Sequence, residues 1–279
     1  MNAITPDHPA HALDAYRIMA RGEFAFAEEL SRPACPVCNG TGHARTEIDG
    51  MITMGRCRCQ MLPDRIQLFN RAAIPARYLT ATFLSFAQTT DGQLKELDPS
   101  AIRAMGRASQ WVEMFTPGES NKGFVLYGDV GRGKTHLLIA TVRELIFRHG
   151  IPVRFIEFSR LLSSLKAGYS EGRSDSELLS ELDEVPVLAI DELGKGRLSD
   201  WELTIIDEVV SRRYNAMGCT LATTNYRPGD PSGAAPPNLA TSAQLTQTLG
   251  DRVGDRVYSR LTQVVEFIEL AGRDHRTDA

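Results

Sequence analysis

The stretch Gly128–Thr135 has the residue types and spacing of a phosphate-binding loop. It reads Gly-Asp-Val-Gly-Arg-Gly-Lys-Thr, a complete G-x-x-x-x-G-K-[ST] pattern. Glycines let the backbone curl so that N–H groups converge on phosphate oxygens, while Lys134 reaches the β- and γ-phosphates and the Thr135 hydroxyl binds Mg²⁺. The expected nucleotide contacts are the loop and the residue after it: Gly128, Asp129, Val130, Gly131, Arg132, Gly133, Lys134, Thr135 and His136. The pattern predicts a site for a nucleoside triphosphate.

The segments on either side of this loop are those that a phosphate site requires. Gly123–Tyr127 is a short apolar run of strand type, and apolar residues recur at helical spacing after the loop until Gly150, a residue suited to end a helix. A strand–loop–helix order places phosphate at the positive end of a helix dipole.

Two carboxylates follow a second apolar run. Val185–Ile190 is unbroken and apolar, as expected for a central parallel strand, and it ends in Asp191 and Glu192. We expect Asp191 to hold Mg²⁺ through water beside Thr135, and Glu192 to polarise a water for attack on the γ-phosphate. Asn225, at the end of the next strand, could orient the same water.

The rest of this region alternates between strands and helices. Pro152–Phe155 and Thr220–Thr223 are strand-like, and Ser199–Glu202 has the form of a capping box that opens a helix. This alternation predicts an α/β fold with a doubly wound parallel sheet, and ligands at the carboxyl ends of its strands.

Four of the five cysteines fall between residues 35 and 59. Cys35 and Cys38 form a C-x-x-C pair, and Cys57 and Cys59 form a closer pair. Two such pairs can complete a tetrahedron, which predicts structural Zn²⁺, although His43 could replace one thiolate. The alternative is a set of free or disulfide-paired thiols. The fifth cysteine, Cys219, is expected to be a buried small hydrophobic residue.

The N-terminal part has weaker signals. Apolar residues between positions 13 and 30 predict one broken amphipathic helix or two short ones, which either pack on the next module or dock a partner protein. The expected division is an N-terminal partner-binding module with the zinc site (1–62), a linker and lead-in segment (63–100) and an ATPase domain (101–279).

Composition excludes several classes of protein. The chain has 31 Lys and Arg against 35 Asp and Glu, a net charge of −4, so any nucleic-acid contact must come from a local patch. No apolar run approaches the roughly 20 residues of a membrane helix. The first residues have neither a basic nor an apolar region of a signal peptide, so a cytoplasmic location is expected.

The order of these motifs resembles the AAA+ ATPases of the DnaC/DnaI helicase-loader and IstB transposition-helper group. The matching segments are Ile74–Tyr78 with Ala81–Phe83, Gly128–Leu137, Ile190–Gly194, Thr223–Asn225, Tyr258–Leu261 and Gly272–Arg276. The resemblance implies that Arg260 is an arginine finger inserted into the ATP site of a neighbouring subunit of a homo-oligomer. It also implies that Arg276 contacts phosphate in its own or an adjoining site. A cation that arrives in trans would stabilise charge on the γ-phosphoryl group.

Within this group, the cysteine cluster favours a loader, because loaders of the DnaI type resemble this chain in having a zinc-bearing N-terminal domain that grips the helicase. The resemblance therefore implies an ATPase that binds ATP or ADP with Mg²⁺ and delivers a DnaB-type ring helicase onto single-stranded DNA. Two alternatives stay open. One is an IstB-like transposition helper ATPase, and the other is a nucleotide-dependent adaptor with little turnover.

Overall fold

The computed structural model describes residues 16–30, 35, 37–48, 51–89, 91–119, 121–170, 172, 174–196, 199–229, 247–272 and 274. Arg276, one of the predicted phosphate contacts, lies outside this part of the chain.

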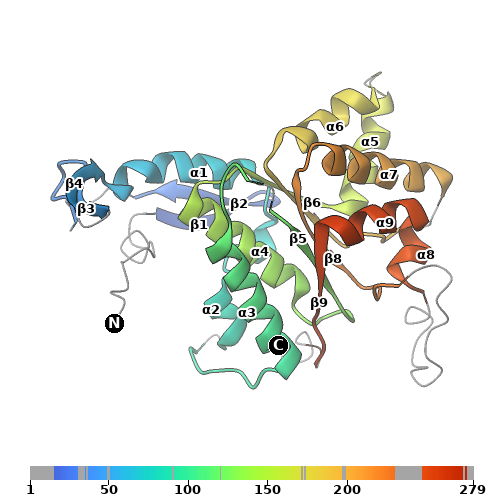
Figure 1. Ribbon diagram of the computed structural model, residues 1–279, viewed down its shortest axis with the longest axis horizontal. Helices are drawn as coiled ribbons and strands as arrows, with labels where there is room; N and C mark the ends of the chain where they lie inside the picture. The colour runs from blue at the N-terminus through green and yellow to red at the C-terminus, as the bar shows by residue number, and fades with distance from the viewer. Residues whose placement is uncertain are drawn as a thin grey trace.

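A parallel sheet of five strands forms the centre of the molecule (Figure 1). Its strands are β5 (Gly123–Tyr127), β6 (Val153–Glu157), β7 (Val187–Asp191), β8 (Cys219–Thr224) and β9 (Val265–Glu269). They lie in the order β6-β7-β8-β5-β9, and every neighbouring pair is parallel. Every residue of β7 and β8 is buried, which explains why these strands have apolar rather than alternating sequences.

Helices cover both faces of the sheet, so the predicted doubly wound α/β fold is confirmed. On one face, Phe124 and Leu126 of β5 pack with α3 (Pro99–Met114), α4 (Lys134–Glu144) and the helical turn Leu145–His149 that extends α4. On the other face, Val125 packs with five helices. These are α5 (Phe158–Ser170), α6 (Asp175–Glu184), α7 (Asp200–Asn215), α8 (Leu249–Val253) and α9 (Asp255–Val264).

The predicted ends of two helices are also confirmed. Gly150 ends the turn after α4 in the left-handed region, with φ of 68°. Ser199 caps α7 by accepting from the Glu202 N–H, and the Glu202 side chain accepts from the Ser199 N–H in return.

The N-terminal segment forms a hairpin, so the helices expected between residues 13 and 30 are wrong for the part of that stretch that the structure describes. Strands β1 (Tyr16–Arg21) and β2 (Phe24–Glu29) pair antiparallel through a turn in which Gly22 has φ of 61°. Ala25 and Ala27 are buried while Phe24, Phe26 and Glu28 are not, which is the alternation of a strand with one covered face. The small alanines carry this pattern, and the larger apolar residues mask it.

A second hairpin and a helix follow. The strands β3 (His43–Ile48) and β4 (Met51–Arg56) project from one end of the molecule beside α1 (Leu62–Arg71), as Figure 1 shows. Leu62, Ile66 and Phe69 of α1 share one buried cluster with the β1–β2 hairpin and with α4. The short turn Ala76–Tyr78 and helix α2 (Phe83–Ala87) then lead to α3. The exact division at residues 62 and 100 stays a prediction.

Candidate nucleotide-binding site

The phosphate loop joins β5 to the first residue of α4. Gly128, Gly131 and Gly133 all have positive φ, at 143°, 80° and 88°, which a residue with a side chain rarely adopts. Helix α4 begins at Lys134, and its N-cap residue Gly133 has no side chain that could cap the helix. The first N–H groups of α4 therefore remain available to an anion.

Three other segments pack closely against these glycines. A Cβ on Gly128 would lie 2.1 Å from the Leu270 carbonyl oxygen, and one on Gly133 would lie 2.6 Å from the Phe86 ring. A Cβ on Gly131 would overlap the Asp274 carboxylate. Larger residues are thus excluded by packing as well as by backbone conformation.

The ammonium group of Lys134 is turned into the loop. The side chain is 7% exposed, and Nζ donates to the carbonyl oxygens of Gly128 at 2.8 Å and Asp129 at 2.6 Å. The loop carbonyls thus hold the cation that is expected to bind the β- and γ-phosphates. Arg132 lies at 3.6 Å from the Asp129 carboxylate, and Val130 is exposed.

The predicted magnesium ligands come together at the end of β7. Thr135 Oγ1 donates to Asp191 Oδ1 at 2.8 Å, and Thr223 Oγ1 donates to the same oxygen at 2.6 Å. Burial raises the pKa of Asp191, while the two hydroxyl groups act in the opposite direction. A carboxylate and a hydroxyl are the hard oxygen ligands that Mg²⁺ prefers, so these residues fit that ion.

Sequence reasoning missed Thr223 as a member of this site. Thr223 lies in β8, which pairs with β7, and its hydroxyl also accepts from the Glu192 N–H at 2.9 Å. One hydroxyl thus fixes both acidic positions. The adjacency of β7 and β8, which no motif records, is the signal that was needed.

Glu192 has a backbone conformation different from that of Asp191. Its φ of 58° lies in the left-handed region, so the extended backbone of β7 ends at Asp191. The Glu192 carboxylate forms an ion pair with Lys195, which the sequence did not indicate, and this bond raises the pKa of Lys195. Asn225, the predicted water-orienting residue, is the first residue after β8 and is half-buried.

Arg252 holds the segment that carries Glu192 and Lys195. This buried side chain on α8 donates to the carbonyl oxygens of Gly194 at 3.0 Å and Gly196 at 2.5 Å. Sequence reasoning gave it no role. A cation that binds two carbonyls of the same loop fixes where the loop after β7 can lie.

His136 is directed toward α2 in this structure. Its Nε2 lies 2.9 Å from the Thr82 carbonyl oxygen and 3.1 Å from Ser85 Oγ. Thr82 is the N-cap of α2, and Phe86 of the same helix packs on Gly133. The segment that contains α2 is therefore attached directly to the phosphate loop and its helix. A contact between His136 and nucleotide stays a prediction.

Arg260, the predicted finger, lies on α9 and contacts α7 of its own chain. Its Nη1 donates to Asp207 Oδ1 at 3.0 Å and to the Ser211 hydroxyl. Arg256 lies 3.6 Å from the same Asp207 carboxylate. A role in a neighbouring subunit's site stays a prediction.

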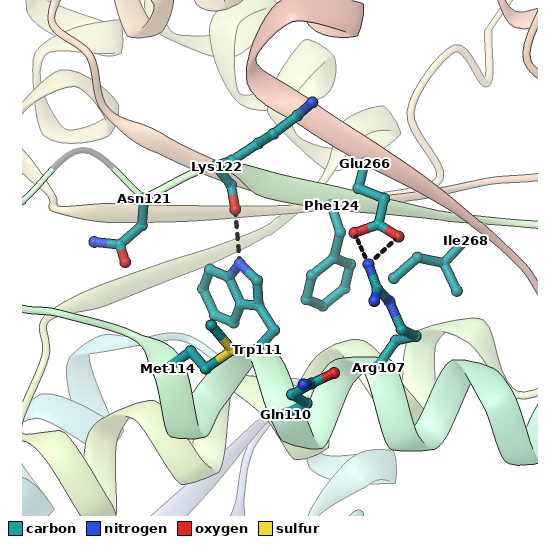
Figure 2. A pocket seen from close by; sticks show the side chains of 9 residues that line it. All are labelled: Arg107, Gln110, Trp111, Met114, Asn121, Lys122, Phe124, Glu266 and Ile268. Atoms are coloured by element: carbon teal, nitrogen blue, oxygen red, sulfur yellow. Dashed lines mark hydrogen bonds and ion pairs between the residues drawn. The ribbon is translucent and has the colours of Figure 1, made fainter.

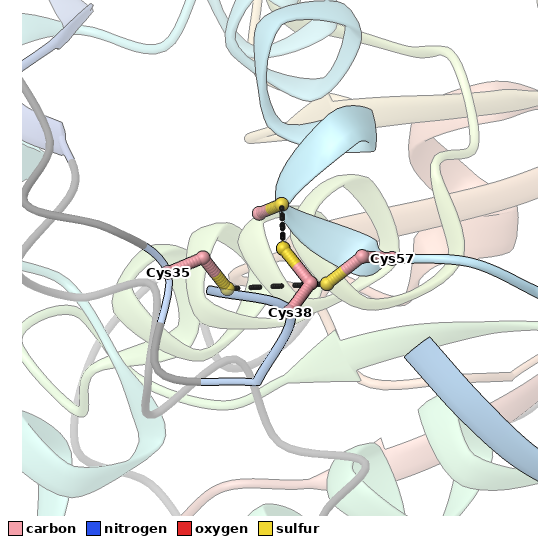
Figure 3. A group of neighbouring side chains, drawn as sticks. Cys35, Cys38 and Cys57 are labelled. Carbon is pink, nitrogen blue, oxygen red and sulfur yellow. Dashed lines mark hydrogen bonds between the residues drawn. The ribbon is translucent and has the colours of Figure 1, made fainter. Parts of the chain in front are cut away.

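The four clustered cysteines lie close enough to share one metal ion. Their sulfur atoms all lie within 4.8 Å of one another, with 3.9 Å between Cys35 and Cys57 and 3.6 Å between Cys38 and Cys59. Figure 3 shows the sulfurs of the three labelled cysteines turned toward one another. Zn–S bonds of about 2.3 Å at tetrahedral angles require sulfurs about 3.8 Å apart, so the cluster fits zinc. His43 is exposed and its Nδ1 lies 3.2 Å from the Thr41 carbonyl oxygen, outside the cluster.

Cys219 opens β8 and is buried, as expected. All five cysteines are free thiols in this structure. Among the helices that the structure describes, none combines the length and apolar character needed to cross a membrane.

The sheet order and the phosphate loop define an AAA+ fold with a P-loop nucleotide site. The family model for IstB-like ATP binding protein matches residues 84–272, and the chain belongs to that family. The chain is 30% identical over 190 residues to the replicative helicase loader DnaC of Escherichia coli (strain K12), covering 68% of this chain and 67% of that protein. It is 28% identical over 193 residues to the DnaC of Buchnera aphidicola (subsp. Acyrthosiphon pisum), with 68% of both chains covered.

Solved structures agree with this assignment. A crystal structure of the DnaC helicase loader matches with a TM-score of 0.56 and 30% identity, over 70% of this chain and 99% of that one. The crystal structure of DnaI has the same fold, with a TM-score of 0.51 and 23% identity over 73% of this chain. The cysteine cluster precedes residue 84 and so lies outside the family match.

Proposed function

We propose that this chain is a helicase loader that binds and hydrolyses ATP and delivers a ring helicase onto single-stranded DNA. The observation that carries the proposal is the hydrogen-bonded set Thr135–Asp191–Thr223 beside a complete phosphate loop, in a chain 30% identical to a replicative helicase loader over 68% of its length. The set provides the metal-ligand chemistry, and the likeness to DnaC provides the expected partner.

In the proposed reaction, Lys134 leaves the Gly128 and Asp129 carbonyls and binds the β- and γ-phosphates. Both states satisfy the ammonium group, so the exchange does not leave a buried cation without a partner. Thr135 and Asp191 would hold Mg²⁺, which neutralises charge on the phosphates. Asp191, raised in pKa by burial, would be ionised by the nearby cation.

Glu192 would orient and polarise the attacking water, with Asn225 as its partner. The Glu192 carboxylate first has to leave Lys195. Arg260 would complete a neighbouring subunit's site, for which its side chain has to leave Asp207 and Ser211. Assembly would then be coupled to hydrolysis, because both rearrangements require a partner or nucleotide to replace the lost contacts.

The N-terminal module would serve the helicase. Four thiolates around Zn²⁺ close its coordination shell, so the ion would be structural and would fix the β3–β4 hairpin relative to α1. A hairpin that projects from the end of the molecule is suited to reach a partner (Figure 1).

Two observations favour alternative functions for this chain. The matching family model is described as IstB-like, which favours a transposition helper. The Glu192–Lys195 ion pair favours an adaptor with little turnover, because it occupies the proposed base.

Co-purification with a replicative helicase, with and without ATP, tests the proposal. We expect capture of the helicase that increases with ATP, and loss of the ATP effect with Lys134→Ala. Capture of a transposase, with no capture of helicase, would replace the loader by the transposition helper. A Glu192→Gln variant that releases phosphate as fast as the wild type would exclude the hydrolytic role of Glu192.

A further inference from the structure

A cleft lies where the β1–β2 hairpin meets α1 and the amino ends of β6 and β7. Its volume is about 940 Å³, and its charged and aromatic lining consists of Arg21, Phe24, Phe26, Arg71, Arg154 and Glu184. The phosphate loop follows the carboxyl end of β5, so the cleft and the nucleotide site are at opposite edges of the parallel sheet. The cleft is therefore a separate site.

The outer face of the hairpin supplies an aromatic and basic surface to this cleft. Arg21 is the cross-strand partner of Phe24, and Phe26 follows on the same face two residues later. The Arg21 guanidinium lies over the Phe26 ring, 4.8 Å from its centroid. The intervening Ala25 is buried against the core, so the hairpin cannot turn this face inward.

The walls of the cleft are held by contacts that need no ligand. The Asn70 side chain accepts from the Ala27 N–H at 2.7 Å and donates to the Ala27 carbonyl at 3.0 Å, which joins the hairpin to α1. Arg154 Nη1 donates to the Arg71 carbonyl at 3.1 Å, which joins β6 to the end of α1. A preformed site of this kind loses little conformational entropy when it binds.

We propose that this cleft binds single-stranded nucleic acid. The inference deepens the proposed function, since it names the surface through which a loader would hold the strand. Three arginines face one glutamate here, in a chain whose net charge is −4, so the cleft is a local positive patch. Arginine forks bind phosphates, and both phenylalanine rings and guanidinium planes stack on bases.

The spacing of the two rings favours a single strand. Side chains two residues apart on a strand are about 6.7 Å apart, roughly twice the 3.4 Å rise of stacked nucleotides. Such rings suit bases that have been separated from one another. A duplex keeps its bases stacked inside and would offer only phosphates, and an acidic peptide would not need two flat rings.

A second hollow, between α3 and the edge strand β9, provides a contrast. Arg107 forms an ion pair with Glu266 there, and the Trp111 indole N–H donates to the Lys122 carbonyl at 2.7 Å (Figure 2). Its charges are thus matched within the protein. Exposed arginines on α3, Arg103 and Arg107, can therefore serve as a matched control.

The test measures the binding of a labelled oligothymidylate of about 20 nucleotides to the full chain by fluorescence anisotropy, over a range of salt. Arg21→Ala with Arg71→Ala should weaken binding at least tenfold. It should also lower the log–log salt slope by about 1.4, since each phosphate contact on a single strand contributes about 0.7. Phe24→Ala should weaken binding about tenfold with little change in that slope. Arg103→Ala with Arg107→Ala, which removes the same charge, should bind as the wild type.

Several results would overturn the proposal. These are a wild-type chain that binds no single strand, cleft variants that bind as the wild type, and an equal loss in the α3 control. A duplex bound as tightly as the single strand would reject the single-strand class, and loss of helicase capture with unchanged DNA binding would assign the cleft to a protein. If thermal melting shows that the arginine double variant does not fold, a strand that contains 5-bromouracil is photo-crosslinked to the wild type instead. The proposal requires the crosslinked residue to lie within residues 21–26, and a crosslink elsewhere rejects it. Helicase capture tests the loader function separately, so the two proposals can fail independently.

Discussion

Replacing Thr223 with valine should weaken both the fold and the metal site. Thr223 is 1% exposed, and valine has almost the same shape, so the change removes a hydroxyl group and little packing. That hydroxyl donates to Asp191 Oδ1 at 2.6 Å and accepts from the Glu192 N–H at 2.9 Å. Within the described part of the chain, no other side chain forms hydrogen bonds with both the Asp191 carboxylate and the Glu192 N–H.

The size of the effect follows from these two bonds. A hydrogen bond to a charged group contributes about 2 kcal/mol, and a buried N–H left without its acceptor costs about 1 kcal/mol more. The free energy of unfolding should therefore fall by about 3 kcal/mol. At about 2–3 °C for each kcal/mol in a chain of this size, the melting temperature should fall by about 6–9 °C. The pKa of Asp191 should rise further, since one of the two hydroxyls that oppose burial is lost.

Urea and thermal unfolding without nucleotide measure the loss of stability. Titration of a fluorescent ATP analogue with and without Mg²⁺ measures the weakening of the metal site. Thr223→Ser keeps the hydroxyl and loses one methyl group, so it should cost only about 1 kcal/mol and retain Mg²⁺-dependent binding. If the valine and serine variants unfold within about 1 kcal/mol of each other, the hydroxyl does not organise the site.

Three further predictions concern other parts of the molecule. Lys195→Ala should increase the rate of phosphate release severalfold, because it frees the Glu192 carboxylate. Lys195→Arg, which can keep the ion pair, is the control. If the alanine and arginine variants release phosphate at the same rate, the ion pair does not limit turnover. Cys35→Ser should lose one zinc per chain by elemental analysis while Cys219→Ser, in the central sheet, retains it, and a wild type without zinc would reject the site. Burial raises the pKa of Asp191 in the folded chain above its value of about 3.8 in the unfolded chain. The protonated Asp191 carboxyl therefore stabilises the fold fully below about pH 3.8, and this stabilisation is lost as the pH rises through the folded pKa. Asp191→Asn should therefore be at least as stable as the wild type toward urea at about pH 7 without magnesium. If the stability of the wild type rises relative to that of the variant between about pH 5 and pH 7, the predicted direction of the pKa shift is wrong.

The central domain could be predicted from sequence because its local signals agree with the fold. The glycine spacing of Gly128–Thr135 is needed by the backbone, the apolar run Val185–Ile190 is needed by a strand buried on both faces, and Ser199 and Glu202 cap each other. In each case the signal lies in a short run of neighbouring residues, so it can be recognised along the chain without knowing the distant contacts.

The features that were missed depend on contacts distant in the sequence. Thr223 joins Asp191 because β8 pairs with β7, and the arginine cleft combines residues 21–26 with Arg71 and Arg154. No stripe of aromatic and basic residues is visible along the chain for the same reason. The β1–β2 hairpin was mistaken for helix because β2 is buried through Ala25 and Ala27, whose small side chains give a weak signal in an apolar pattern.

Helix α4 connects these local and distant features. Its first residue, Lys134, belongs to the phosphate loop, and Arg143 near its end donates to the Leu79 and Ala81 carbonyls at 2.9 and 3.1 Å. The Arg143 guanidinium also interacts with the Tyr16 hydroxyl of the hairpin, and burial lowers the pKa of this arginine while Tyr16 opposes that change. A shift of α4 on nucleotide binding would have to carry both the 79–81 segment and the hairpin with it, or break the bonds of this half-buried guanidinium. Because breaking these bonds is costly, α4 and the β1–β2 hairpin are joined by partly buried polar contacts.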